Sequence, residues 1–167
     1  VAALVDHIFV MAYDMHGMWD TYSDLGAPLY QPSGYSPQYK NSVADGIRAY
    51  LSAGIPAEKL VLGIPFYGYL YEGVSGEGQG LYSPFRSARS IAYDEVVGSY
   101  ITKAGMNQAF HAEAAVPYLY GNGLFVSYDD ARSVRAKAFY AGSQGLAGVG
   151  IWELSHNRAG ELARHAY

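Results

Sequence analysis

The sequence predicts an α/β fold: part of a TIM (β/α)8 barrel into which a small α+β domain is inserted. Three short apolar runs, each typical of a buried parallel strand, alternate with segments of helical periodicity. A closed barrel typically needs about 250 residues, and these 167 residues provide only three strand-helix units. An open doubly wound sheet is the alternative, but the long connections after the first two strands favour the barrel.

The first unit is predicted from an apolar run, a long connection and an amphipathic segment. Residues 5–14 contain strand formers in a run too short for a helix. Residues 15–40 are rich in glycine and proline, which predicts an irregular loop, and long loops are often functional. Residues 42–53 predict a helix that ends at Gly54, because its apolar residues recur on one helical face: Val43, Ile47, Tyr50 and Leu51.

The second unit begins with a nearly continuous apolar run at residues 60–67, as expected for a strand covered on both faces. Residues 70–128 differ in character, because they combine many glycines and tyrosines with short strand-like pieces. We therefore predict that they form the inserted α+β domain. The glycines between Gly73 and Gly80 do not follow a phosphate-binding pattern and are interpreted as a surface turn.

The third unit follows the insertion. The pair Asp129-Asp130 predicts a helix N-cap, and the helix continues through Val134, Ala138, Phe139 and Ala141 to Gly142. A third strand is predicted at residues 146–152 and a short closing helix at residues 158–166. The predicted division is therefore 1–69 for two barrel strands with their loop and helix, 70–128 for the insertion, and 129–167 for the last barrel elements.

Composition and charge exclude several classes of function. The net charge of −4, without a cluster of basic residues, argues against nucleic acid as a partner. No apolar run approaches the ~20 residues that span a membrane. There is no cysteine, and the five histidines show no helical pair at a zinc spacing, so neither a metal nor another cofactor is expected. The N-terminus shows no readable targeting signal.

Aromatic residues are abundant, with 17 Tyr, 6 Phe and 2 Trp. Their flat apolar faces and polar edges suit a sugar-binding cleft, although they also suit an ordinary polar-rimmed core. The run from Phe9 to Asp20 is the most informative stretch, because an apolar strand ends there in a phenol and a carboxylate and then presents a tryptophan after a glycine. This pattern is typical of a strand that leads into a site-forming loop.

Four segments in order carry a family resemblance. The segment Met11-Ala-Tyr-Asp14, followed by His16-Gly17 and Trp19-Asp20, resembles the sixth-strand motif of glycoside hydrolase family 18 chitinases. Residues 60–68, LVLGIPFYG, resemble the seventh strand, and residues 148–154, GVGIWEL, resemble the eighth. The segment 70–128 lies where the larger members carry a chitinase insertion domain. The resemblance implies an extracellular, cofactor-free hydrolase of chitin or chitooligosaccharide.

The resemblance also implies roles for the residues at the strand ends. The family mechanism is substrate-assisted, with the sugar's own acetamido oxygen as the nucleophile. Tyr13 would donate to that oxygen, and Asp14 would hydrogen-bond the same sugar. The residues alone allow a plainer interpretation, in which Tyr13 caps the barrel core and Asp14 caps the next turn. Met11 is expected on the floor of the pocket, because strand alternation places it on the same side as Tyr13.

Three aromatic residues are the remaining substrate-binding candidates. By resemblance, Trp152 is the platform beneath the sugar before the cleaved bond, and Trp19 is a second platform on the leaving-group side. Taken alone, Trp152 would be a core residue and Trp19 a loop anchor. Tyr67 is a weaker candidate near the insertion. The family often has an arginine two positions later, where this chain has Tyr69, and His16 is interpreted as a loop-packing residue.

One part of the family pattern is missing. The catalytic glutamate of the family closes a DxxDxDxE motif on the fourth strand, and no such motif occurs in these 167 residues. We therefore expect a C-terminal fragment of a chitinase that lacks the acid, has no hydrolytic turnover alone, and pairs with the N-terminal part of the same barrel. Open sheet edges would otherwise favour aggregation. The alternatives are a chitinase-like lectin, or a family 18 hydrolase of peptidoglycan or glycoprotein glycans.

Overall fold

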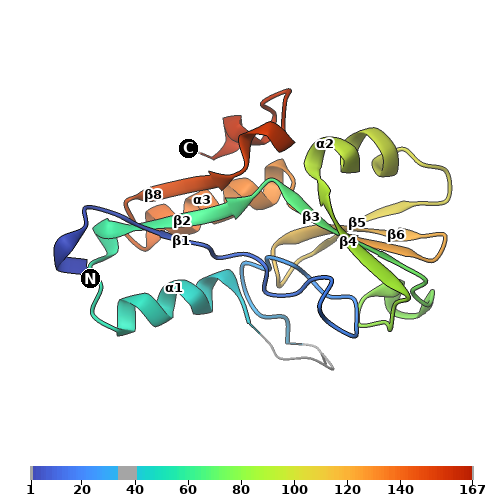
Figure 1. Ribbon diagram of the computed structural model, residues 1–167, viewed down its shortest axis with the longest axis horizontal. Helices are drawn as coiled ribbons and strands as arrows, with labels where there is room; N and C mark the ends of the chain where they lie inside the picture. Colours follow the sequence, from blue (N-terminus) through green and yellow to red (C-terminus); the bar gives the residue numbers. More distant parts are fainter. Residues whose placement is uncertain (1, 34–40, 167) are drawn as a thin grey trace.

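The structure is a computed structural model that describes residues 2–33 and 41–166. Two sheets lie end to end along the long axis of the molecule (Figure 1). A three-stranded parallel sheet has the order β1 (Ile8–Val10), β2 (Leu60–Pro65), β8 (Gly148–Trp152). A five-stranded antiparallel sheet has the order β4-β3-β7-β6-β5. The predicted α/β class is confirmed by the parallel sheet, whereas its closure into an eight-stranded barrel stays a prediction.

The parallel sheet is covered by helices on one face. α1 (Val43–Ser52) begins at Ser42, whose hydroxyl accepts a hydrogen bond from the Asp45 amide. It packs, together with α3 (Ala131–Ser143), against the buried side chains of β2. The helix was predicted closely, but Tyr50 is exposed, because only the first two turns of α1 bury side chains against the sheet.

The first strand is shorter than the predicted 5–14. β1 pairs with β2 over only Ile8 to Val10, and the Ala12 amide donates to the Val10 carbonyl in a turn that ends the strand. Phe9 lies on the face away from the helices, where its ring approaches the backbone of Gly63 and Gly150. The predicted loop 15–40 has no helix or strand over residues 15–33, and its residues 34–40 lie outside the described part of the chain.

The second predicted strand, 60–67, is in fact two strands that meet at Phe66. β2 ends at Pro65, and β3 (Tyr67–Glu72) begins the antiparallel sheet. The Phe66 amide donates to the Trp152 carbonyl of the parallel sheet, whereas its carbonyl accepts from the Tyr93 amide of the insertion. The antiparallel sheet therefore begins at Tyr67, before the predicted start of the insertion at Leu70, because an apolar run does not reveal which sheet each residue joins.

The insertion is an antiparallel sheet with one short helical segment. After β3 come β4 (Ser87–Ala92), β5 (Asn107–His111), β6 (Val116–Gly121) and β7 (Leu124–Ser127). The helical segment joins α2 (Tyr93–Val96) to a π-helical turn, Val97–Ile101. β3 lies between β4 and β7, so it is paired on both edges.

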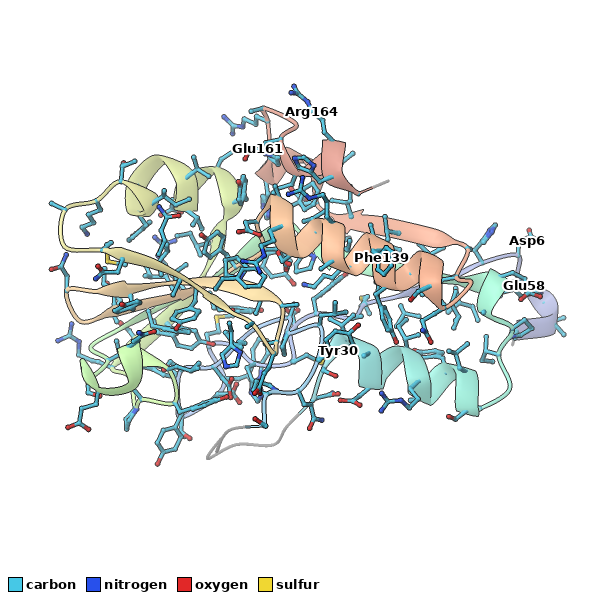
Figure 2. All side chains as sticks on the ribbon, turned by 180° about the vertical axis from the view of Figure 1, so that it is seen from behind. Asp6, Tyr30, Glu58, Phe139, Glu161 and Arg164 are labelled. Atoms are coloured by element: carbon cyan, nitrogen blue, oxygen red, sulfur yellow. The ribbon has the colours of Figure 1, made fainter. Side chains whose placement is uncertain are left out.

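The chain returns to the parallel sheet through α3. Asp130 caps this helix in a capping box with Ser133, as the sequence predicts. Phe139 does not join the core and is 80% exposed on the outer surface of α3 (Figure 2). The closing helix predicted at 158–166 is only a 3-10 turn, η6 (Leu162–His165), because Gly160 adopts a left-handed conformation just before it.

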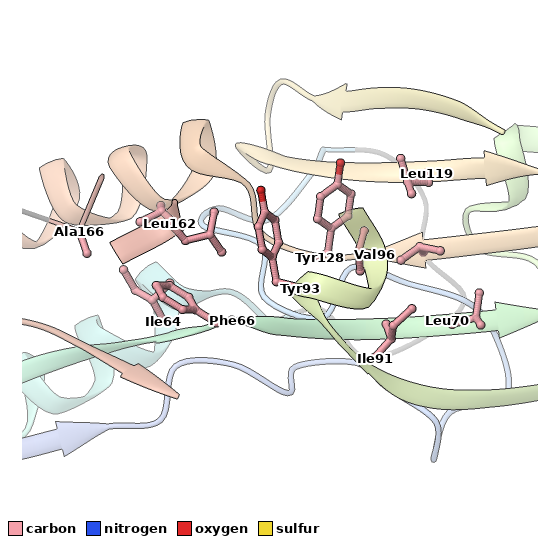
Figure 3. Packing of buried hydrophobic residues seen from close by; sticks show 12 residues of the cluster. Ile64, Phe66, Leu70, Ile91, Tyr93, Val96, Leu119, Tyr128, Leu162 and Ala166 are labelled. Atoms are coloured by element: carbon pink, nitrogen blue, oxygen red, sulfur yellow. The ribbon is translucent and has the colours of Figure 1, made fainter. Parts of the chain in front are cut away.

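Four further short 3-10 segments complete the secondary structure of the described residues: η1 (Ala2–Leu4), η2 (Ala57–Lys59), η3 (Glu77–Gly80) and η5 (Leu154–His156). One buried cluster spans both sheets, and Figure 3 shows Ile64 and Phe66 packed with insertion residues such as Ile91 and Tyr93. The same cluster includes Leu162 of the closing segment. This shared core fixes the insertion against the end of the parallel sheet.

Candidate active site

The candidate site forms where the parallel strands end. Tyr13 and Asp14 come after β1, and Trp152 is the last residue of β8. Tyr67 comes after β2, separated from its end at Pro65 by Phe66 alone. The C-terminal ends of parallel strands in one sheet point the same way, which is why barrel enzymes build their sites there. β2 lies between β1 and β8, so the three groups come from adjacent strands.

Asp14 is held by two phenols from the insertion. The Tyr67 hydroxyl donates to Asp14 Oδ1 at 2.6 Å, and the Tyr69 hydroxyl donates to the same oxygen at 2.7 Å. Asp14 has a left-handed backbone, with φ of 59°, which aspartate tolerates better than most residues. The conformation turns the chain out of the strand, and the two phenols fix the carboxylate in that turn.

Both phenols stay protonated donors at neutral pH. Burial, followed by the hydrogen bond to Asp14, raises the pKa of Tyr67 above its ordinary value, and the same two causes raise the pKa of Tyr69. Tyr13 lies beside them, with its ring edge-on to Tyr67 at 6.0 Å between ring centres. Burial also raises the pKa of Tyr13, so its hydroxyl is a donor as well.

Trp19 projects from the loop after β1. Its ring is 55% exposed and meets Tyr69 edge-on at 5.5 Å between ring centres. A side chain at Gly17 would collide with this indole, since an added Cβ would lie 2.6 Å from Trp19 Cη2. The loop residue Gly17 therefore has to be glycine for Trp19 to lie where it does.

The loop itself is fixed by His16, as the sequence interpretation expects. The buried imidazole lies between two carboxylates, with Nδ1 3.1 Å from Asp20 Oδ2 and Nε2 3.5 Å from Asp24 Oδ2. The Gly17 amide donates to the same Asp20 oxygen. Two carboxylates around one buried histidine give the loop that carries Trp19 a defined shape.

Trp152 is also 55% exposed, so it is not a core residue. Its backbone is held on the side that faces β2, because it pairs with Pro65 in the parallel register and its carbonyl accepts from the Phe66 amide. The peptide bond that joins it to Glu153 is cis. A rigid backbone with a free indole face is what a stacking platform requires.

Met11 differs from Tyr13 in its exposure to solvent. Its side chain is 70% exposed, whereas Tyr13 is 9% exposed. The reason is that β1 ends at Val10, so the two-residue alternation of a strand does not extend through these positions. Met11 still lines, with Tyr13 and Asp14, an open hollow of about 410 Å³. Its part in substrate binding stays a prediction.

Sequence reasoning missed two residues of this cluster. Tyr69 was noted only as a departure from a family pattern, yet strand alternation from Tyr67 could have placed it on the same face of β3. His156 lies with its ring centre 6.2 Å from that of Tyr67, and its buried Nδ1 has no hydrogen-bond partner among the described residues. No sequence pattern links His156 to the site, because its segment follows β8 as an irregular turn.

The cluster combines one carboxylate, that of Asp14, with three phenols and two exposed indoles. Within residues 2–33 and 41–166, no set of three or more acidic, histidine or cysteine side chains could hold a metal ion. No helix in this part of the chain is long and apolar enough to cross a membrane. The chemistry available here is hydrogen bonding from phenols, acceptance by one carboxylate and stacking on exposed indoles.

Comparison with known proteins agrees with this geometry. The model of the family described as "Glycosyl hydrolases family 18" matches residues 1–157. Chitinase A1 of Niallia circulans is 40% identical over 173 residues, covering 95% of this chain and 25% of that protein. The class V chitinase of Arabidopsis thaliana is 31% identical over 99% of this chain and 44% of that protein.

Solved structures show the same relationship. A glycoside hydrolase family 18 N-acetylglucosaminidase from Paenibacillus barengoltzii matches 99% of this chain and 49% of its own, with a TM-score of 0.93 and 32% identity. A family 18 chitinase from Cycas revoluta, in complex with (GlcNAc)4, matches 99% of this chain and 47% of its own, with a TM-score of 0.86 and 30% identity. The chain thus spans about half or less of these relatives, and it belongs to glycoside hydrolase family 18.

Proposed function

We propose that these residues are the substrate-positioning part of a chitinase, which hydrolyses β-1,4 N-acetylglucosamine linkages by a substrate-assisted, retaining mechanism. The observation that carries the proposal is Asp14, held through Oδ1 by two phenols and placed beside Tyr13 at the ends of adjacent strands. The relatives named above support it, because most are chitinases and one is described with bound (GlcNAc)4.

The proposed chemistry assigns each group a step. The acetamido oxygen of the sugar attacks its own anomeric carbon, and the bond to the leaving oxygen breaks as that oxygen receives a proton. Tyr13 donates to the acetamido oxygen, while Asp14 accepts from the acetamido N–H and stabilises the positive charge of the oxazolinium-like intermediate. Water then attacks the anomeric carbon and opens the oxazolinium ring, which gives retention of configuration.

The exposed aromatic residues bind the sugar rings. Trp152 is proposed as the platform beneath the sugar that carries the reacting acetamido group, and Trp19 as a platform on the leaving-group side. Met11 and Tyr67 complete the substrate-binding set, Met11 by apolar contact at the rim and Tyr67 through its bond to Asp14. Each indole offers one free face to the axial C–H groups of a sugar.

The proton donor is not proposed among these residues. The 167 residues contain no DxxDxDxE motif, and we propose that the acid comes from a part of the same barrel outside this sequence. General acid catalysis contributes typically 10²–10⁴-fold, and without a donor the leaving sugar must depart as an alkoxide. We therefore expect binding of chitooligosaccharide by this chain and no turnover.

The experiment compares binding and cleavage on the same purified chain. Calorimetry with triacetyl chitotriose should show binding that Trp152→Ala weakens by about ten-fold, equivalent to about 1.4 kcal/mol. Phe139→Ala is the matched control, because it removes an exposed aromatic ring from the outer surface of α3, away from the strand ends. Equal affinities for wild type and Trp152→Ala would show that Trp152 is not a binding platform. Measurable cleavage would show that the chain does contain a proton donor.

A further inference from the structure

Tyr69 is the group that connects the carboxylate of the site with its exposed indole. Its hydroxyl donates to Asp14 Oδ1 at 2.7 Å, and its ring meets Trp19 at 5.5 Å between ring centres. No other side chain with a hydrogen bond to Asp14 among the described residues also contacts Trp19. One residue therefore supports two groups that come from different points of the loop after β1.

The Tyr69 ring has little freedom to move. It is buried on β3, which is paired on both edges, and Tyr67 and Tyr71 lie on either side at 6.1 and 6.5 Å between ring centres. On the remaining side an added Cβ at Gly26 would lie 3.2 Å from the ring, so the backbone of the loop already closes against it. A tightly packed ring cannot move easily, so it also restricts the movement of the groups that it contacts.

The hydrogen bonds to Asp14 are unevenly divided between its two oxygens. Both phenols donate to Oδ1, while Oδ2 has no hydrogen bond from any described residue. A carboxylate has about four acceptor positions, two on each oxygen. The phenols thus occupy the acceptor positions of Oδ1 and leave those of Oδ2 available to a ligand.

We propose that Tyr69 is a positioning residue: its hydroxyl fixes Asp14 so that Oδ2 accepts from the substrate, and its ring supports Trp19. The proposal rests on the function proposed above and deepens it. The two phenols are neutral donors, so they hold the carboxylate in place without cancelling its negative charge, and Oδ2 can still accept from the substrate. Its two contacts also tie the placement of the reacting sugar to that of the sugar on Trp19.

The first test separates the hydroxyl from the ring. Tyr69→Phe keeps the contact with Trp19 and removes one donor to Asp14, and we expect triacetyl chitotriose to bind about five- to ten-fold more weakly by calorimetry. Tyr120→Phe is the matched control, because it removes the same atom from β6 of the same sheet, and we expect less than about a two-fold change. Circular dichroism confirms that each variant is folded.

A double-mutant cycle distinguishes positioning from a general structural role. Asp14→Gly removes the carboxylate and suits the left-handed backbone at this position. In that background, Tyr69→Phe should change the affinity by less than about two-fold, because its hydroxyl no longer has a target. An equal loss with and without Asp14 would overturn the proposal.

The second test measures, without ligand, whether the ring of Tyr69 supports Trp19. With Trp152→Phe, Trp19 is the single tryptophan of the chain. Tyr69→Leu should then increase acrylamide quenching of Trp19 by about two-fold, because the indole loses an aromatic neighbour, whereas Tyr69→Phe should leave quenching unchanged. Equal quenching in all three proteins would show that the Tyr69 ring does not support Trp19.

The outcomes separate the two proposals. If the wild-type chain binds triacetyl chitotriose and Trp152→Ala weakens that binding, but Tyr69→Phe does not, the proposed function stands and the role of Tyr69 is wrong. If the wild-type chain does not bind the trisaccharide, the proposed function of these residues fails and the role of Tyr69 in binding fails with it. The quenching result still decides whether Tyr69 supports Trp19.

Discussion

Lys137→Met should be among the most destabilising single substitutions in this chain. Lys137 lies on α3 with its side chain 0% exposed, and its Nζ is 2.7 Å from both Asp129 oxygens. Asp129 is 2% exposed and accepts one further bond from the Ser133 hydroxyl at 2.6 Å. Burial lowers the pKa of Lys137 below its ordinary value, and the neighbouring Asp129 carboxylate offsets part of that shift.

The magnitude follows from what the substitution leaves behind. Methionine fills most of the volume of the lysine but donates no hydrogen bond, so the Asp129 carboxylate loses both bonds from Nζ and keeps the bond from the Ser133 hydroxyl. Removing one partner of a buried pair typically costs about 3–5 kcal/mol, because the other charge remains buried and uncompensated. Against a typical total of about 5–15 kcal/mol, this is a large fraction of the stability of the fold.

Urea denaturation followed by circular dichroism measures this loss as a lower midpoint at constant slope. Lys103→Met is the control, because Lys103 only lies over the ring of Tyr100, and we expect a change within about 0.5 kcal/mol. The double variant Lys137→Met with Asp129→Leu removes both charges and should recover most of the loss. A loss below about 1 kcal/mol for Lys137→Met, or no recovery in the double variant, would refute the reasoning.

Three further outcomes are expected. Burial raises the pKa of Tyr71 and Tyr128 above the ordinary value of 10.0. The two neutral phenols therefore favour the folded state fully below about pH 10, and the free energy of unfolding should fall above that pH, as monitored by tyrosinate absorbance. A free energy of unfolding that stays constant up to about pH 12 would contradict this expectation. Gly17→Ala should displace Trp19 and raise its quenching by acrylamide, and an unchanged value would show that the loop can adjust. The outer edges of β1 and β8 have no partner strand among the described residues, so light scattering should detect self-association, and a stable monomer would argue against it.

Local signals in the sequence predicted α1 and α3 well, although the closing helix at 158–166 is only a 3-10 turn. Ser42 and Asp130 both cap the helices that follow them, because a short polar side chain bonds the free amides of the first turn wherever the rest of the chain lies. The strands were predicted in the right order but with wrong ends. Strand length depends on the partner strand, and β1 pairs over three residues only, which its own apolar run could not reveal.

The sequence predicted most directly the part of the site that one strand-end motif contains. Tyr13 and Asp14 were found because the motif places them together, and the structure puts both beside Tyr67. The prediction for Met11 relied on an alternation that ends at Val10. The bond from Tyr69 joins residues 55 positions apart, and a contact of that separation depends on the packing of two sheets and not on any local pattern.

The joint at Phe66 explains why the insertion matters to the chemistry. Phe66 is bonded to Trp152 of the parallel sheet and to Tyr93 of the insertion, so β3 leaves the parallel sheet with a fixed direction. Tyr67 and Tyr69 are the first and third residues of β3, and both reach Asp14. The insertion is therefore more than a wall beside a cleft, because its first strand supplies both hydrogen-bond donors to the carboxylate. A change that shifts the insertion sheet should then alter the placement of Asp14, even when every residue at the end of β1 is intact.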